Sequence, residues 1–195
     1  MTFVFDEDLK IAYKKSDEVL EKLGNNFEKP IRTADIVNTV SEIYDCKINM
    51  YATSFSELDP KIKKVGAMMR AYLNDSSITT FEIYLNSDKD VQFQRFSLLH
   101  ELGYIAMGCV GPFFTNDKGF ILSANTNYNI IDLPEDYKEN KILLKEQLAN
   151  IFALRIAMPN ELFYKIINEQ NDLDKIAKFF GIKKNAVFSR IMLAS

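Results

Sequence analysis

Two stretches near the start of the chain carry apolar residues at three- and four-residue steps, the pattern of a helix with one buried face. The first stretch covers residues 8–23 and stops at the Gly-Asn-Asn turn of residues 24–26. The second begins after Pro30, where Thr33 can cap it, and it should end near Asp45. The pattern therefore predicts two amphipathic helices in the first quarter of the chain.

The next part of the chain alternates apolar with polar residues, which is the period-two pattern of half-buried strands. The alternation covers residues 46–51 and again residues 81–85. Between them, residues 63–74 favour another strand, and the Ser/Thr/Asp-rich residues 74–80 favour a loop. We therefore expect a small antiparallel sheet.

Two longer helices are predicted in the second half of the chain. Residues 91–106 are apolar on nearly all sides, which is typical of a helix buried in the middle of a domain. Residues 111–139 scatter Gly, Pro, Asn and Asp among short apolar pieces and favour a long irregular connection. A second strong helix runs over residues 139–157, and Pro159 marks its end.

The tail, residues 172–195, is predicted to form a pair of short helices that Gly181 separates. Its apolar positions suit a helix-turn-helix in which Lys183, Lys184 and Arg190 are exposed. A structural helical pair that closes the domain is the simpler interpretation.

Composition limits the kind of protein. A chain of 195 residues with 47% hydrophobic content is expected to form a single domain over residues 1–195. The acidic first ten residues do not suit a secretory signal, and no apolar run is long enough to span a bilayer, so we expect a cytoplasmic protein without membrane contact.

Charge and cysteine usage give two further expectations. With 24 basic against 27 acidic residues, the overall field does not favour a polyanion, and nucleic acid is not the expected partner. Cys46 and Cys109 have no C-x-x-C spacing, so neither a disulfide framework nor a structural zinc knuckle is indicated. Both thiols are expected to be reduced and buried.

His100 is the single histidine of the sequence, so any histidine-dependent chemistry must involve it. It opens His-Glu-Leu-Gly-Tyr, one residue away from H-E-x-x-H, in which two histidines one helical turn apart bind zinc and the glutamate activates a water. Positions i and i+4 share a helix face, so His100 and Tyr104 can point at one spot beside Glu101. Taken alone the pentapeptide is a weak signal, because a His-Glu pair on an apolar helix is more often a core histidine and a surface acid.

Two ordered blocks strengthen that signal. Residues 95–108, RFSLLHELGYIAMG, resemble the active-site helix of the ImmA/IrrE family, whose pattern is approximately R-F-S/T-L-x-H-E-x-G-H. Residues 146–153 and the Met-Pro pair at 158–159 are similar to the second block of that family, E-x-x-A-N/D-x-F-A leading to Met-Pro. Residues 31–44 and 173–191 resemble its early helix and its closing segment. The chain is therefore identified as a member of this family.

The resemblance implies an α+β, zincin-like fold, with a small antiparallel sheet packed on a helical bundle. Two central helices of that bundle carry the active site, and a helical pair closes the C-terminus. By position, the family's roles fall on His100 as a metal ligand, Glu101 as the general base and Glu146 as the third ligand. The position of the second histidine ligand is Tyr104, and Asn150 can orient a ligand through its amide.

The tyrosine puts the metal in question. Catalytic zinc ordinarily needs three protein ligands and an open position for water. A phenol must lose its proton to bind a metal well, which at neutral pH costs roughly 4 kcal/mol. We therefore expect zinc to be bound weakly or to be absent. In one interpretation Tyr104 packs or hydrogen-bonds in the old site and the protein is a pseudo-peptidase. In another, His100, Glu146 and either Tyr104 or a water hold a metal beside Glu101.

Members of the family regulate mobile elements or stress responses by cleaving a helix-turn-helix repressor, so the resemblance implies a protein partner of that kind. The leading hypothesis is a regulatory metallopeptidase-fold protein whose catalysis is impaired or altered by Tyr104. The nearest alternative is a non-catalytic pseudo-peptidase that sequesters its partner. A third, direct DNA binding through residues 172–195, predicts salt-sensitive duplex binding.

Overall fold

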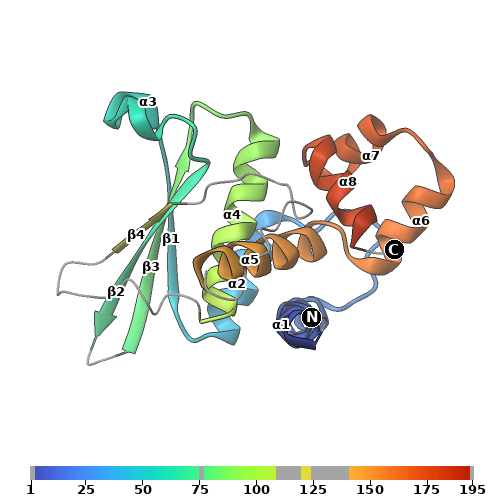
Figure 1. Cartoon of the computed structure of the whole chain (residues 1–195), viewed down its shortest axis with the longest axis horizontal. Helices are drawn as coiled ribbons and strands as arrows, with labels where there is room; N and C mark the ends of the chain where they lie inside the picture. The colour runs from blue at the N-terminus through green and yellow to red at the C-terminus, as the bar shows by residue number, and fades with distance from the viewer. Residues whose placement is uncertain (1–2, 75–76, 109–119, 124–140, 194–195) are drawn as a thin grey trace.

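The computed structural model describes residues 3–74, 77–108, 120–123 and 141–193, which form a sheet with helices packed on one side (Figure 1). The four strands are β1 (Lys47–Thr53), β2 (Ala67–Asn74), β3 (Ser77–Asn86) and β4 (Phe120–Ser123). Their order in the sheet is β1-β3-β2-β4. The α+β class predicted from the sequence is confirmed.

The pairing of β1 differs from the prediction of an antiparallel sheet. β2 is antiparallel to both β3 and β4, but β1 pairs with β3 in parallel. The sheet is therefore mixed, because the chain returns from β1 through a short helical segment before the β2–β3 hairpin begins. Alternation of apolar residues reports which side chains are buried, and it does not report strand direction.

Two predicted connections are also partly strand. Most of the expected loop at residues 74–80 lies in β2 and β3, where Ile78, Thr79 and Thr80 have the β-branched side chains that suit extended backbone. Within the predicted irregular connection, Phe120–Ser123 form β4. The rest of that connection lies outside the described residues, as does Cys109, which precedes it. Cys46 is buried and is not in a disulfide.

The described helices are α1 (Phe3–Leu23), α2 (Thr33–Ile43), α3 (Phe55–Leu58), α4 (Val91–Ala106), α5 (Lys141–Ala157), α6 (Asn160–Glu169), α7 (Leu173–Phe180) and α8 (Lys184–Met192), with a 3-10 turn at Pro60–Ile62. The bounds of α4 are those predicted, and the Asp90 carboxylate caps it by accepting from the Phe93 amide. Thr33 is not the cap of α2, because Arg32 is its N-cap residue and makes no side-chain capping bond. None of the described helices is both long and apolar enough to cross a membrane.

Helix α4 occupies the centre of the molecule, between the sheet and the C-terminal helices α6, α7 and α8 (Figure 1). Every residue of α4 from Phe96 to Ala106 is buried, which is why its sequence is apolar on nearly all sides. The face of the sheet that packs on the helices is also apolar. Its buried side chains include Ala67, Met69, Ala71, Phe81 and Ile83.

Gly103 allows α5 to cross α4 closely. A Cβ atom at Gly103 would lie 3.0 Å from both the Cα and the carbonyl oxygen of Ala149, and 3.2 Å from Cδ1 of Phe152. These distances are shorter than ordinary van der Waals contact, and two of the three atoms belong to the α5 backbone. Glycine at this position therefore sets the distance between the two helices that carry the predicted site.

Arg95 ties the start of α4 to the segment that precedes α2. Its guanidinium donates to the hydroxyl of Thr33 at 2.7 Å and to the carbonyl of Ile31 at 2.9 Å, and burial lowers its pKa. A lysine ammonium cannot place two nitrogen donors in one plane as the guanidinium does. We therefore expect Arg95→Lys to lower the free energy of unfolding by about 2 kcal/mol. Chemical denaturation measures this loss, and Arg32→Lys, at an exposed arginine, is the matched control.

The C-terminal helical pair is formed as predicted, except that Arg190 is buried. Gly181 separates α7 from α8 in the left-handed conformation, with φ of 64°, as a glycine in that position permits. Arg190, expected to be exposed, is 2% exposed. It donates to the Met158 carbonyl and to the Asn160 side chain, and it lies over the Phe163 ring. Arg190 is therefore a structural cation.

Candidate functional site

His100 lies fully buried on α4 and faces α5. Its Nδ1 is 2.9 Å from Oδ1 of Asn150. Because an amide oxygen only accepts, Nδ1 carries the proton and donates it to Asn150. This contact orients the ring so that Nε2 points towards Glu146. Glu146 lies on α5, one turn before Asn150.

Glu146 joins His100 to Tyr104. Its Oε2 is 3.3 Å from His100 Nε2, an ion-pair distance without hydrogen-bond geometry, and its Oε1 accepts a short hydrogen bond from the Tyr104 hydroxyl. The rings of His100 and Tyr104 meet edge to face, with centroids 5.1 Å apart. The i and i+4 positions of α4 thus converge on one carboxylate of α5, as the spacing requires.

Glu101 is the most unusual group of the site. Its side chain is fully buried, and neither carboxylate oxygen has a hydrogen-bond partner among the described residues. Burial raises the pKa of Glu101 to about 8; the neighbouring His100 lowers it in part, and Glu146 raises it further. A carboxyl group with such a pKa is suited to take and return a proton near neutral pH.

The same charges act on His100 in the opposite sense. Burial by itself lowers the pKa of the imidazole, but the Glu146 carboxylate, with smaller contributions from Glu101 and Asn150, outweighs burial and raises it. The neighbouring acidic groups thus favour the protonated form of the imidazole, against the effect of burial.

The donor atoms fit a metal ion in part. His100 Nε2 and Glu146 Oε2 are both buried and have no hydrogen-bond partner in the described structure. Two ligands of a tetrahedral zinc ion, each about 2.1 Å from the metal, are separated by about 3.4 Å, close to the observed 3.3 Å. These two atoms are thus placed as ligands of one small cation.

The site lacks a standard third ligand for a metal ion among the described residues. Within the part of the chain that the structure describes, no three His, Cys, Asp or Glu side chains gather as a metal cluster. The group next to the pair is the phenol of Tyr104, which donates to Glu146. His100, Glu146 and Tyr104 would therefore hold a metal only if the phenol, or a water, completes the set.

The structure brings together all five residues that the sequence singled out. His100, Glu101 and Tyr104 come from α4, and Glu146 and Asn150 come from α5. Sequence reasoning allowed a hydrogen bond from Tyr104 but did not identify Glu146 as its partner, because a contact between side chains 42 positions apart has no signature in a single sequence.

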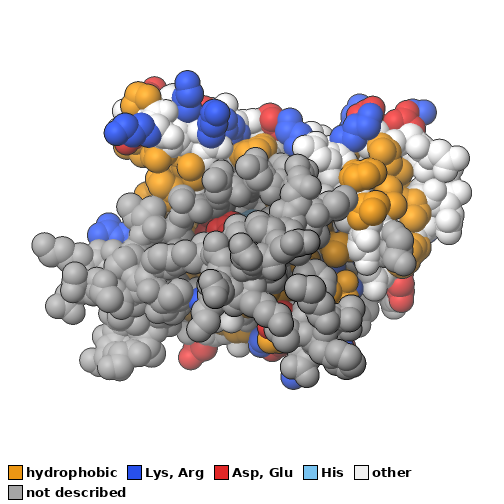
Figure 2. All heavy atoms as spheres, in the orientation of Figure 1, with side chains coloured by type: hydrophobic (Ala, Val, Ile, Leu, Met, Phe, Trp, Pro, Cys, Tyr) orange, Lys and Arg blue, Asp and Glu red, His pale blue; other side chains and the backbone are white. Residues whose placement is uncertain are grey.

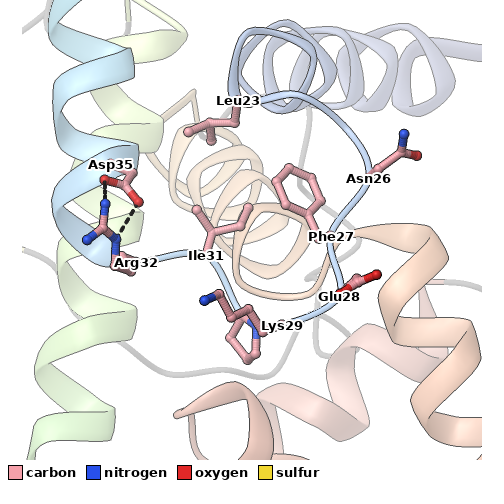
Figure 3. A pocket seen from close by; sticks show the side chains of 9 residues that line it. Leu23, Asn26, Phe27, Glu28, Lys29, Ile31, Arg32 and Asp35 are labelled. Atoms are coloured by element: carbon pink, nitrogen blue, oxygen red, sulfur yellow. Dashed lines mark hydrogen bonds and ion pairs between the residues drawn. The ribbon is translucent and has the colours of Figure 1, made fainter.

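A separate hollow of about 520 Å³ lies at the turn between α1 and α2 (Figure 3). None of the site residues lines it. Its apolar part is formed by Leu23, Phe27 and Ile31, and the Arg32–Asp35 ion pair lies at its rim. The lining combines both charge signs and points to no particular ligand.

These features are those of a metallopeptidase-like protein, with a histidine and a glutamate on one buried helix and a further glutamate on the helix that crosses it. The family model of the IrrE N-terminal-like domain matches residues 61–192. The chain therefore belongs to this family. The match supports the ImmA/IrrE identification and a zincin-like fold. The family is associated with zinc in general. A comparison with curated proteins finds no match.

The unpaired Glu101 carboxyl gives a prediction for stability. Its pKa is raised on folding, so the unfolded chain ionises first, and stability is lost as pH rises from about 4.5 to about 8. We expect Glu101→Gln to stabilise the metal-free protein by about 2 kcal/mol at pH 8 and by much less at pH 5. Urea denaturation with a chelator at both values measures the difference, and an equal effect at both would contradict the prediction.

Proposed function

We propose that the protein is a cytoplasmic regulator that acts on a helix-turn-helix repressor, with zinc-dependent peptide hydrolysis impaired or altered by Tyr104. The observation that carries the proposal is the bond from the Tyr104 hydroxyl to Glu146 Oε1, at the position where the family has its second histidine ligand. The phenol engages the third ligand of the family's set, so the site keeps its scaffold but has a different donor group.

Each residue of the site would have a distinct role in hydrolysis. Asn150 fixes the ring of His100, and His100 with Glu146 would hold the ion, which when bound polarises a carbonyl and acidifies a water. Glu101, buried next to His100 on α4, would take a proton from the attacking water and return it to the leaving amine. Tyr104 would weaken this arrangement because its proton must leave before its oxygen can serve as a ligand.

A pseudo-peptidase that binds and sequesters the repressor is the alternative, and an exposed apolar surface on α7 and α8 is compatible with a protein partner in both cases. Phe179 of α7 and Phe188 and Met192 of α8 are exposed. Figure 2 shows hydrophobic side chains on the surface over these helices.

Direct DNA binding by the tail has less support. Arg190 is buried, and two further cations of the tail are engaged, since Lys183 pairs with Asp90 and Lys184 with Asp174. Duplex binding that weakens with salt would contradict this view.

The two proposals differ in whether Glu101 is needed. The experiment co-expresses the protein with a candidate helix-turn-helix repressor and follows both reporter expression and repressor length. We expect Glu101→Gln to abolish repressor cleavage and derepression while the variant remains folded. If derepression persists without cleavage, the enzymatic proposal is wrong and sequestration is supported. Glu161→Gln, at an exposed glutamate of α6, is the matched control.

A further inference from the structure

The outer edge of β1 lacks the features that keep an edge strand from pairing with another chain. β1 stands at the end of the order β1-β3-β2-β4, so among the described strands only β3 lies beside it. Its seven residues contain no proline, its pairing with β3 has no register shift, and its single charged side chain, Lys47, is at the first position. Prolines, bulges and charges within the strand are the usual protections of an edge.

The backbone groups of every second β1 residue point away from β3. The Thr53 carbonyl accepts from the Ser87 amide, which follows β3, so Thr53 faces β3. Because the direction alternates along a strand, the N–H and C=O groups of Ile48, Met50 and Ala52 point to the outer edge. No hydrogen bond between residues that the structure describes uses these groups.

Cys46 marks where this unused edge begins. It belongs to the same alternate series, but its N–H donates to the Ser41 carbonyl at 3.1 Å and its carbonyl accepts from the Ser41 hydroxyl. The unused groups are therefore those of Ile48, Met50 and Ala52, a series that is symmetric about Met50.

We propose that two copies of this chain pair through β1, antiparallel to each other about a two-fold axis at Met50. In this register Met50 exchanges both backbone bonds with Met50 of the second copy, and Ile48 does so with Ala52. One continuous sheet then runs through both copies, in the two-fold symmetry that is commonest among homo-oligomers. The inference lies outside the proposed function, because no residue of β1 belongs to the site on α4 and α5.

The exposed side chains of β1 suit this register on both faces of the sheet. Met50 and Tyr51 are each 44% exposed, although both are large apolar or aromatic side chains in the middle of a strand. Pairing covers Met50 with its own counterpart across the axis. On the opposite face Tyr51 already stacks on Tyr84, with ring centroids 5.2 Å apart, and the Tyr51 ring of the second copy becomes its diagonal neighbour.

Charges at the ends of β1 favour the same pairing. Lys47 is placed opposite Thr53 of the second copy, next to Asp88, whose carboxylate accepts from the Ser56 amide at 2.9 Å. Lys47 and Asp88 are both exposed. The symmetry repeats this attraction at the other end of the strand, and no two like charges of β1 face each other.

The test is sedimentation velocity of the full-length protein over a wide range of concentration. We expect the mass to rise from the 22.5 kDa of one chain to twice that value. Met50→Lys places two like charges opposite each other at the axis, so it should stay monomeric with the circular dichroism of the native protein. Met50→Leu should dimerise as the native protein does. Phe188→Lys, at an exposed apolar position of α8, is the matched control and should also dimerise.

Hydrogen exchange followed by NMR gives a second readout without any substitution. The amides of Ile48, Met50 and Ala52 should exchange about tenfold more slowly at a concentration where about nine in ten chains are paired. The amides of Asn49 and Tyr51 face β3 and should be protected at every concentration.

Four outcomes would overturn the proposal. They are a protein that is monomeric at every concentration, a dimer that survives Met50→Lys, a dimer that Phe188→Lys dissociates, or a dimer whose outward β1 amides exchange as fast as in the monomer. If Met50→Lys fails to fold, the exchange of the native protein decides alone. Since neither measurement involves a repressor or a metal, their failure is separable from failure of the proposed function.

Discussion

Tyr104→His is expected to raise the affinity for zinc by about 1,000-fold. The variant rebuilds the H-E-x-x-H set, with two imidazoles one turn apart on α4 and Glu146 of α5 as the third ligand. It also removes the need to deprotonate a phenol, which at neutral pH corresponds to about 4 kcal/mol, or about three powers of ten in affinity. Elemental analysis of untagged protein purified with zinc, together with a chelator competition, measures the gain.

Tyr104→Phe is the control for this prediction. It removes the hydroxyl without adding a nitrogen, so it should not gain zinc. Near-stoichiometric zinc of equal affinity in the native protein and in Tyr104→His would mean that the tyrosine or a water already completes the site. In that case catalysis is not impaired by the loss of a ligand, and repressor cleavage by the native protein is expected at an ordinary rate.

Part of the clustering of the candidate residues could be predicted from helical spacing, whereas the meeting of the two helices was implied only by the resemblance to the ImmA/IrrE family. His100 and Tyr104 share a face of α4, and Glu146 and Asn150 share a face of α5, whatever the rest of the chain does. The burial of Glu101 was not predictable in the same way. A glutamate on an apolar helix is ordinarily placed on the surface, and its full burial depends on the packing of α4 between the sheet and α5.

The errors in the predicted fold have a common origin. The parallel pairing of β1 with β3 and the burial of Arg190 both depend on segments far apart in the sequence. Local periodicity reports whether a position is buried on its own helix or strand, but it does not report which distant element covers it. Arg190 was therefore expected at the surface, although the Met158 carbonyl and the Phe163 ring accommodate it inside.

Gly103→Val is expected to destabilise the protein by about 3 kcal/mol or more. The new Cβ would meet the backbone of Ala149 at 3.0 Å, and backbone atoms inside a helix have no rotamer by which to move away, so α4 and α5 must separate. Gly103→Ala should cost less, because alanine recovers about 1 kcal/mol of helix propensity and adds no further atoms. Urea denaturation of the two variants measures the order.

The same series tests whether close helix packing holds the site together. If α5 moves away from α4, the distance between His100 and Glu146 increases, and metal binding should fall in parallel with stability when Gly103→Ala is combined with Tyr104→His. As a control, Phe152→Leu shortens a side chain at the same crossing without adding an atom at position 103. It should lower stability and leave metal affinity nearly unchanged. Equal losses of affinity in both variants would mean that general stability, and not the distance between α4 and α5, governs the site.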